Sequence, residues 1–198
     1  GRSNTGGVFT PIALGTGDTW TATPMTGAPG ISSGASSVWT GSRAIFWGGF
    51  NYVAGTWLNT GAQYDPISNT WTPLTTTGLP GTRSGHGGVW TGREMIIWGG
   101  NSGGRLNTGG RYDPIADTWT ATTTTGAPLP RQTFAFIWSG RELIVWGGGL
   151  TASLTNTGGR YDPETNTWTA TTTTGAPAER SVYSNGSTWT GRELFVWG

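Results

Sequence analysis

The sequence contains no cysteine and no lysine, and its only histidine is His86. The missing cysteine excludes a disulfide scaffold, a thiolate metal site and thiol catalysis. The missing lysine excludes Schiff-base catalysis, and a single histidine cannot form a multi-histidine metal site. We therefore expect no catalytic residue, no metal ligand and no cofactor in this chain.

Charge and long hydrophobic runs are also scarce. Charged residues make up 11% of the 198 residues and the formal net charge is +1, so no basic surface for nucleic acid or for an anionic membrane is predicted. No apolar run approaches the roughly 20 residues of a membrane span, and no basic-then-apolar leader opens the sequence. The length predicts one domain over residues 1–198.

Glycine, threonine and tryptophan take the place of the missing charged residues, and they recur with a period. Twelve of the 13 tryptophans fall into three families of four, spaced by about fifty residues, and only Trp57 stands apart. The families are T-W-T (Trp20, Trp71, Trp119, Trp168), W-[TS]-G (Trp39, Trp90, Trp138, Trp189) and a final apolar run ending in W-G (Trp47, Trp98, Trp146, Trp197). A period of this length is typical of propeller blades.

Each repeat predicts four short strands. In one repeat, residues 83–91 lead into a turn, and residues 94–98 form a nearly continuous apolar run, as in a strand that is buried on both faces. A glycine-rich loop precedes residues 108–112, Asp-Pro turn chemistry follows, and residues 119–123 alternate large and small side chains as an outer strand does. No segment shows a helical period with caps, so the fold class is all-β.

These motifs resemble the kelch repeat. The marks are a double glycine after an apolar strand and a tyrosine separated by a turn from a tryptophan; here they are Gly48-Gly49, Gly99-Gly100 and Gly147-Gly148 with Tyr64/Trp71, Tyr112/Trp119 and Tyr161/Trp168. The first repeat departs from the pattern, because Phe9 replaces the tyrosine. The resemblance covers essentially the whole chain and implies a β-propeller of four-stranded antiparallel blades.

The phase of the repeat predicts how such a ring closes. With strands lettered a to d from the axis outward, the chain opens with strands c and d over residues 5–23, continues with three complete blades, and ends with strands a and b over residues 181–197. We expect the N-terminal strands to complete the last blade, which would remove free sheet edges. Three arrangements remain open: a closed four-bladed ring, a half-ring that self-associates with another chain into eight blades, and a piece of a longer protein.

The repeated tryptophans are expected to form the core between blades, because each can bury roughly 150–250 Å² and the aliphatic content is low. A row of tryptophans that stack on sugars is the alternative. Glycine and threonine would let facing sheets approach closely. On this interpretation, the residues at repeated positions stabilise the fold, and the residues at positions that differ between blades form the binding site.

The loops between strands b and c and between strands d and a lie on one face of a propeller, and this face differs most between blades. An arginine stands at the mouth of three blades, and the innermost strands place further side chains beside it. We predict a ligand-binding or partner-binding site there, formed by Arg83, Arg131, Arg180, His86, Phe134 and Tyr183. Arginine suits bidentate recognition of an acidic peptide or an acidic glycan. The alternative is that these arginines tie adjacent blades together through backbone carbonyls.

Tyr52 and Trp57 in the first b–c loop extend the candidate site, because the repeat does not account for them. The main hypothesis is a non-enzymatic, secreted or cell-surface module that binds protein partners within a larger assembly. A carbohydrate-binding propeller that uses Tyr52, Trp57 and the arginine-lined mouth is the second hypothesis. A glycoside-active hydrolase is the third, with Glu179 as the acid that the repeat explains least.

The segment Asp162-x-Glu164-x-Asn166 begins like a calcium-binding loop. The glycine expected at the sixth position and the bidentate glutamate expected at the twelfth are both missing. We therefore predict that Asp162 caps a turn and holds no calcium ion.

Overall fold

The computed structural model describes residues 5–11, 17–30, 32–182 and 186–197. Within these residues all regular structure is β, with eighteen short strands. Four-residue and five-residue strands separated by glycine-rich turns are what the alternating tryptophan, threonine and aliphatic pattern specifies. The all-β prediction is confirmed.

Three four-stranded antiparallel sheets form the centre of the molecule, and each corresponds to one repeat. Blade 1 consists of β3 (Ser36–Trp39), β4 (Ala44–Trp47), β7 (Gly61–Asp65) and β8 (Thr70–Pro73). Blade 2 consists of β9 (Gly87–Trp90), β10 (Met95–Trp98), β11 (Gly109–Asp113) and β12 (Thr118–Ala121). Blade 3 consists of β13 (Ala135–Trp138), β14 (Leu143–Trp146), β15 (Gly158–Asp162) and β16 (Thr167–Ala170). The innermost strands β3, β9 and β13 are neighbours, so the blades stand side by side around one axis.

Two half-blades and one hairpin complete the described strands. The N-terminal half-blade is β1 (Gly7–Thr10) with β2 (Thr19–Ala22), and the C-terminal half-blade is β17 (Ser187–Trp189) with β18 (Leu194–Val196). The hairpin of β5 (Phe50–Asn51) and β6 (Thr56–Trp57) lies in the loop between the second and third strands of blade 1.

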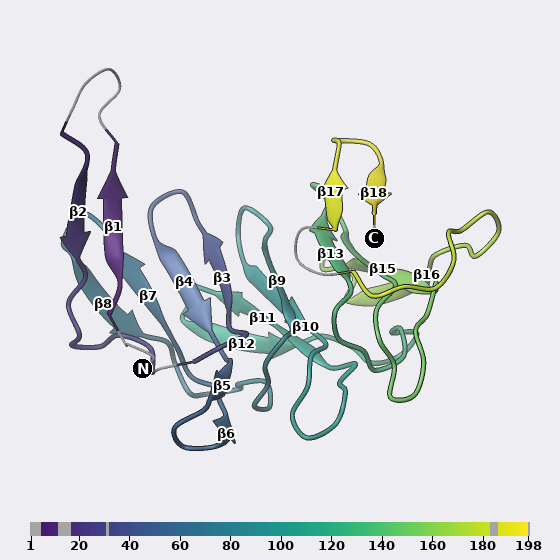
Figure 1. Ribbon diagram of the computed structural model, residues 1–198, viewed down its shortest axis with the longest axis horizontal. Helices are drawn as coiled ribbons and strands as arrows, with labels where there is room; N and C mark the ends of the chain where they lie inside the picture. Colours follow the sequence, from purple (N-terminus) through teal and green to yellow (C-terminus); the bar gives the residue numbers. More distant parts are fainter. Residues whose placement is uncertain (1–4, 12–16, 31, 183–185, 198) are drawn as a thin grey trace.

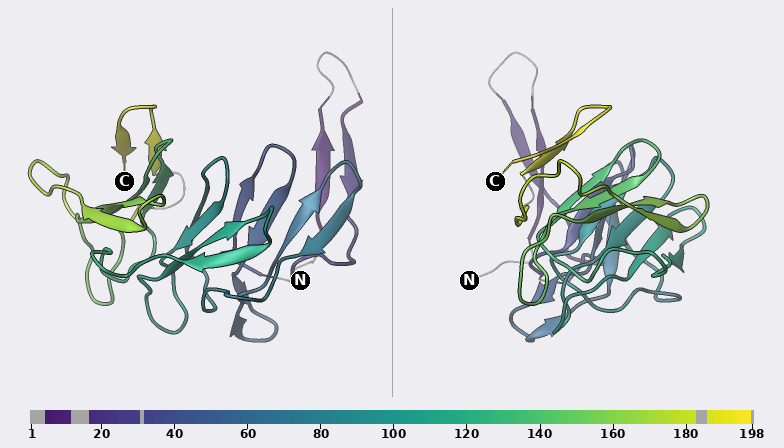
Figure 2. Two further views of the ribbon diagram at one scale, coloured as in Figure 1. Left: turned by 180° about the vertical axis from the view of Figure 1, so that it is seen from behind. Right: turned by 90° about the vertical axis from the view of Figure 1, so that its right-hand side faces the viewer.

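The N-terminal strands do not complete the last blade, so this part of the sequence-based prediction is wrong for the structure. The half-blades form separate two-stranded sheets, and they lie at opposite ends of an open arc (Figure 1). The view from behind shows the same separation (Figure 2). Strand register is set locally by side-chain alternation, whereas ring closure depends on the angle between successive blades, which the alternation does not encode.

The core lies between blades and is aromatic, as the repeat predicts. The cluster between blades 1 and 2 contains Ile45, Trp47, Leu74, Met95, Ile97, Tyr112 and Trp119, and the cluster between blades 2 and 3 contains Ile96, Trp98, Phe134, Leu143, Val145, Tyr161 and Trp168. Trp47 lies 5.3 Å from Trp119, and Trp98 lies 5.3 Å from Trp168, between ring centroids. The same contact is thus made at both complete junctions.

Small residues on the inner strands allow this close approach. A Cβ atom on Gly87 would lie 2.1 Å from the ring of Phe136 in the next blade, so a larger residue would push the blades apart. The prediction of core packing does not extend to every repeated tryptophan, because Trp20, Trp39 and Trp197 are largely exposed. Trp20 and Trp197 belong to the half-blades, whose outer sides have no neighbouring blade within the described residues.

Candidate functional site

The candidate site lies on the loop face, which we define as residues 49–58, 83–85, 100–106, 131–133 and 148–155. Backbone hydrogen bonds join the two kinds of loop on this face: Gly49 N–H donates to Arg83 O at 2.8 Å, and Arg83 N–H donates to Leu58 O at 3.0 Å. The b–c loop of one blade is therefore fastened to the d–a loop that leads into the next, as the strand order predicts.

Arg83 and Arg131 stand at the mouth of blades 2 and 3, but their guanidinium groups point into the protein. Arg83 is 1% exposed and Arg131 is 0% exposed. Nη1 of Arg83 donates to Gly99 O and Thr108 O at 3.1 and 2.6 Å. These carbonyls lie at the end of β10 and just before β11, within blade 2.

Arg131 repeats this arrangement one blade later. Its Nη1 donates to Gly147 O and Thr157 O at 2.9 and 2.8 Å, and its Nε donates to Leu129 O at 2.9 Å. Its backbone N–H donates to Leu106 O of blade 2 at 3.1 Å. The side chain of each arginine thus bonds to its own blade, whereas its backbone N–H bonds to the preceding blade.

Burial lowers the pKa of both Arg83 and Arg131 to about 10, so both remain charged near neutral pH. The prediction that these two residues present donors to a ligand is corrected by their placement, because their donors are committed to backbone carbonyl groups of the protein. The alternative weighed from the sequence, an arginine that ties adjacent blades through backbone carbonyls, describes what they do.

Arg180 precedes the C-terminal half-blade and is only half-buried. Its Nε donates to Ala178 O at 3.1 Å, and its backbone N–H donates to Thr155 O at 3.4 Å, which matches the backbone link made by Arg131. Glu179, the acid considered for hydrolysis, is exposed in the same loop. Tyr183, the remaining aromatic of the predicted site, lies outside the described residues.

His86 and Phe134 lie together on the walls of a hollow of about 480 Å³ beside the innermost strands, with small residues such as Gly85, Gly88 and Ser36 around them. Both side chains are 8% exposed. His86 packs edge-on against Trp47 at 5.2 Å, and Phe134 packs against Trp98 at 5.4 Å. They therefore cover the tryptophans of the preceding blade and line the hollow with the small part of their surface that is exposed.

The environment of His86 keeps its imidazole neutral. Burial, and to a smaller extent the positive charge of Arg83, lowers the pKa of His86 to about 3. The Nε2 atom lies 2.8 Å from the Ser36 hydroxyl, across the junction with blade 1. This histidine therefore acts as a hydrogen-bonded part of the blade junction.

Tyr52, which is exposed, and Trp57, which is half-buried, form the aromatic part of the loop face. Both contact Phe50, which packs edge-on against Tyr52 at 4.8 Å and against Trp57 at 5.0 Å. Asn51 Oδ1 accepts hydrogen bonds from the backbone N–H groups of Val53 and Ala54, so the hairpin turn is fixed. Tyr52 is 58% exposed. We call Phe50, Tyr52 and Trp57 the aromatic hairpin.

A hollow of about 370 Å³ adjoins the aromatic hairpin, and no side chain that lines it is charged. Its other lining residues are Ser33, Gly34, Ser84, Gly85, Asn101 and Gln132. Asn101 and Gln132 were not among the residues selected from the sequence. They follow the double glycine of blade 2 and the buried Arg131, so their positions on variable loops were the only signal that could have identified them.

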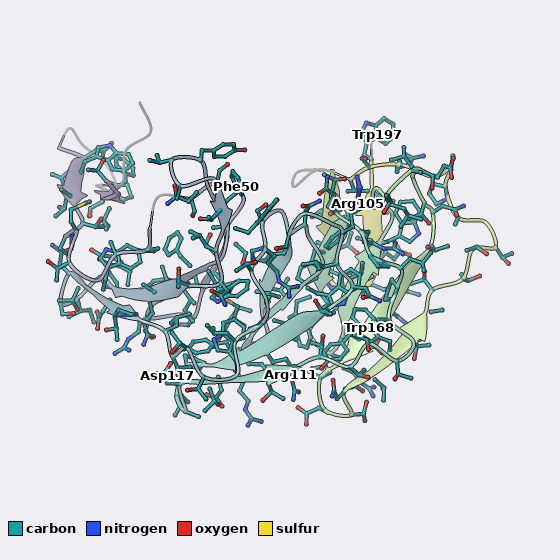
Figure 3. All side chains as sticks on the ribbon, turned by 90° about the horizontal axis from the view of Figure 1, so that it is seen from below. Phe50, Arg105, Arg111, Asp117, Trp168 and Trp197 are labelled. Carbon is teal, nitrogen blue, oxygen red and sulfur yellow. The ribbon has the colours of Figure 1, made fainter. Side chains whose placement is uncertain are left out.

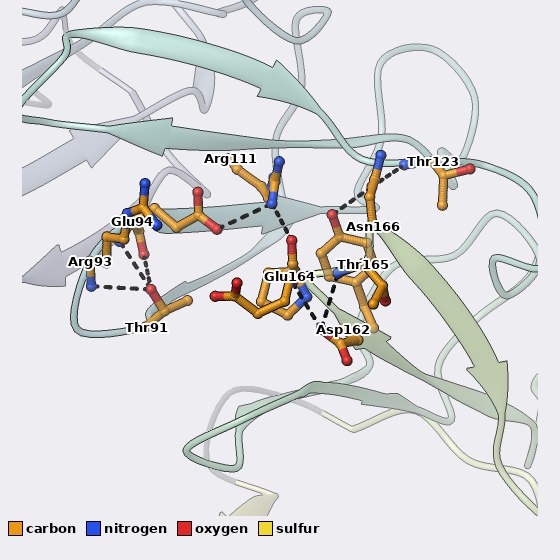
Figure 4. A network of polar contacts seen from close by, with 11 residues as sticks. Thr91, Arg93, Glu94, Arg111, Thr123, Asp162, Glu164, Thr165 and Asn166 are labelled. Carbon is orange, nitrogen blue, oxygen red and sulfur yellow. Dashed lines mark hydrogen bonds and ion pairs between the residues drawn. The ribbon is translucent and has the colours of Figure 1, made fainter.

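Figure 3 places Phe50 and Arg105 on one side of the molecule and Asp117 and Arg111 on the other. The second side carries the repeated a–b and c–d turns, and we call it the turn face. Arg111 pairs with Glu94 at 3.6 Å and donates to Pro163 O of blade 3 (Figure 4). Burial raises the pKa of Glu94.

The Asp162 turn is a capped turn, as predicted. Asp162 Oδ1 accepts from the backbone N–H of Glu164 at 2.9 Å and of Thr165 at 3.4 Å. Asn166 Oδ1 accepts from the Tyr161 hydroxyl at 2.7 Å and from Thr123 N–H of blade 2 at 3.0 Å (Figure 4). In the parts of the chain that the structure describes, no three His, Cys, Asp or Glu side chains gather as a metal site would require.

The blades, the double glycines and the tyrosine–tryptophan pairs together define a kelch-type propeller. The chain belongs to the kelch-repeat family, because residues 13–198 match the family described as the KLHDC2/KLHL20/DRC7 Kelch-repeats domain. Domains of this family are in general non-enzymatic protein-binding modules. No curated protein matches the chain. No described segment forms a helix with the length and apolar character that crossing a membrane demands.

Proposed function

We propose that the loop face binds a protein partner and that the aromatic hairpin is its anchor. The observation that carries the proposal is Tyr52, held edge-on against Phe50 while more than half of its surface faces solvent. Tyrosine and tryptophan supply a large contact area at low entropic cost, and they are enriched among the residues that dominate binding energy in protein interfaces. Family membership supports the same class of function.

The neighbouring hollow supports a partner that presents uncharged side chains. Ser84, Asn101 and Gln132 offer hydrogen-bonding groups, and the aromatic hairpin offers apolar surface. An acidic peptide or acidic glycan was expected because of the three arginines. That expectation loses most of its basis, because the donors of Arg83 and Arg131 are committed inside the blades.

A second blade contributes to the anchor. A Cβ atom on Gly103, in the b–c loop of blade 2, would lie 3.9 Å from Cη2 of Trp57. The indole therefore bridges the loops of blades 1 and 2, so a partner that contacts Trp57 would contact both blades. Secretion or display at the cell surface remains a prediction from composition, and it is independent of this site.

Selection from a random peptide display library tests the proposal. Peptides selected on the full chain should lose at least tenfold in affinity when Tyr52→Ala or Trp57→Ala is introduced. The matched control is Ile115→Ala, because Ile115 is 92% exposed on the turn face. Thermal unfolding of each variant checks that the fold is retained. The proposal is contradicted if the selected peptides keep their affinity for both Tyr52→Ala and Trp57→Ala, or if they lose affinity for the Ile115→Ala control.

A glycan array separates the carbohydrate-binding alternative from this proposal. Both hypotheses use Tyr52 and Trp57, because aromatic faces also stack on sugars. Reproducible sugar binding that Trp57→Ala abolishes, in a protein for which no peptide is selected, would replace the protein partner with a glycan.

A further inference from the structure

The turn face contains a hollow of about 590 Å³ where blade 2 meets blade 3. One wall comes from the a–b turn and the outer two strands of blade 2, and the opposite wall comes from the a–b turn and the c–d turn of blade 3. Both blades are complete within the described residues. Small-molecule sites usually have volumes of roughly 300–1,000 Å³, so this turn-face hollow is large enough for a ligand of that class.

The charged side chains that line the turn-face hollow are balanced in sign. They are three arginines and three acids: Arg93, Arg111, Arg141, Glu94, Asp113 and Glu164. Among the described residues, the corresponding hollow between blades 1 and 2 is lined by Arg43 and Arg93 and by no acid. Arg43 stands there in the place of Glu94, and Gln63 in the place of Arg111. The balanced set therefore distinguishes the junction of blades 2 and 3 from its neighbour.

Turn caps hold the backbone of both walls in place. The Thr91 hydroxyl accepts hydrogen bonds from the backbone N–H groups of Arg93 and Glu94 at 3.2 and 3.0 Å. On the opposite wall, Asp162 Oδ1 accepts from the backbone N–H of Glu164 at 2.9 Å (Figure 4). The charged side chains thus start from fixed backbone positions, which lowers the entropic cost of binding a ligand between them.

Arg111 extends from blade 2 to blade 3 at this hollow. It lies 3.6 Å from Glu94, donates to Pro163 O, and its side chain is 19% exposed. In the described part of the chain, only Nη1 of its three nitrogen atoms has a hydrogen-bond partner. The planar guanidinium therefore keeps unused donors beside a carboxylate that accepts, an arrangement that suits a hydroxyl group, which both donates and accepts.

Trp138 supplies the aromatic part of the wall. It is half-buried, lines the turn-face hollow and packs against the core cluster between blades 2 and 3. An indole offers apolar surface, and in this hollow fixed donors and acceptors surround it. A sugar ring has the complementary chemistry, because it presents an apolar C–H face and a rim of hydroxyl groups.

We propose that the turn-face hollow binds a neutral saccharide, with Trp138 against the sugar ring and with Arg111, Arg141 and Glu164 bonded to its hydroxyl groups. Equal numbers of positive and negative side chains give no net attraction for an ionic ligand. The site lies on the opposite side of the molecule from the aromatic hairpin, as the positions of Arg111 and Phe50 show (Figure 3). It is therefore independent of the protein-binding function proposed for the loop face.

A glycan array with neutral, sialylated and sulfated sugars tests the proposal. The full chain is tetramerised for the array, so that weak binding at single sites is retained. Neutral glycans should bind, and Arg141→Ala and Glu164→Ala should each weaken the binding at least fivefold. Both side chains are exposed and form no hydrogen bond or ion pair with another described residue, so neither substitution should change thermal unfolding.

Arg192→Ala is the matched control. Arg192 takes the place of Arg141 in the a–b turn of the C-terminal half-blade, and its backbone N–H bonds to the Thr190 hydroxyl as that of Arg141 bonds to the Ser139 hydroxyl. It does not line the turn-face hollow. Arg192→Ala should leave the binding of neutral glycans unchanged.

Three results would overturn the proposal. The first is an array on which no neutral glycan binds. The second is stronger binding of sialylated or sulfated glycans than of their neutral parents, because the site would then select charge. The third is sugar binding that Trp57→Ala removes and that Arg141→Ala and Glu164→Ala leave intact, because the sugar would then lie on the loop face.

Discussion

The Arg131 guanidinium, whose residue is fully buried, donates a hydrogen bond of 2.8 Å to the carbonyl oxygen of Thr157. The same side chain also donates hydrogen bonds to Gly147 O and Leu129 O. One arginine therefore satisfies three carbonyl groups at the point where blade 3 begins. Hydrogen bonds of Arg83 and Arg131 connect the loops at the base of the loop face, and the Arg83 backbone N–H bonds to Leu58 O directly after the aromatic hairpin.

Arg131→Met is expected to lower the free energy of unfolding by about 2–5 kcal/mol, because the carbonyl groups of Gly147 and Thr157 lose a charged donor and the Gly147 carbonyl is left buried without it. Chemical denaturation measures the loss. Arg180→Ala is the matched control, since Arg180 occupies the same place in the repeat but is only half-buried. Equal losses for the two variants would contradict the role assigned to burial.

Asn166 is expected to tolerate aspartate but not alanine. Asn166 has a φ of 52° and accepts hydrogen bonds from the Tyr161 hydroxyl and Thr123 N–H. Asp117 fills the same role in blade 2 with a φ of 49°. Asn166→Asp should change the free energy of unfolding by less than about 1 kcal/mol, whereas Asn166→Ala should cost about 2–4 kcal/mol. Similar values for the two variants would show that the carbonyl-type oxygen is not what this turn requires.

The stability of the protein is expected to fall with decreasing pH because of His86. Its pKa is lowered from 6.5 to about 3 in the folded protein, chiefly by burial, so the unfolded chain binds the additional proton between these values. The stabilising contribution of the neutral imidazole is therefore complete above about pH 6.5 and is lost progressively below it, with a limiting slope of about 1.4 kcal/mol per pH unit.

Denaturation of the protein and of His86→Phe between pH 7 and pH 5 measures this contribution. Phenylalanine is the matched substitution, because Phe134 occupies the equivalent position in blade 3. Most carboxylates remain ionised in this window, so the variant should lose most of the pH dependence. A slope that is unchanged in His86→Phe would place the titrating group elsewhere.

The sequence predicts the blades better than it predicts the site. Trp98 and Trp168 recur at fixed strand positions, and a large aromatic residue with a period of one blade has few places to pack except between blades. Arg131 looks like a ligand-binding residue in the sequence because it precedes an inner strand at the loop face. Its side chain turns back into the blade, and that direction depends on carbonyl groups that only the folded loops bring together.

Ring closure, like the direction of the Arg131 side chain, depends on the folded molecule as a whole and could not be predicted from the sequence. The pairing of Phe9 with Trp20 and of Leu194 with Trp189 follows from alternation along each hairpin. The distance between the two hairpins depends on the angle added at every blade junction, which is a property of packing across the whole chain. Tyr52 and Trp57 were identified because they fall outside the repeat, and the structure places both on the aromatic hairpin.

The contact between Trp98 and Trp168 is the most direct test of the claim that aromatic pairs hold the blades together. Trp98→Ala should cost about 3–5 kcal/mol of unfolding free energy because it leaves a large cavity. A double-mutant cycle of Trp98→Leu and Trp168→Leu, measured by denaturation, should give a coupling free energy of about 0.5–1.5 kcal/mol between the two rings. Strictly additive losses of unfolding free energy in this cycle would contradict the claim. The blades would then be stabilised only by the apolar surface that each side chain buries, and not by a specific interaction between the paired indoles.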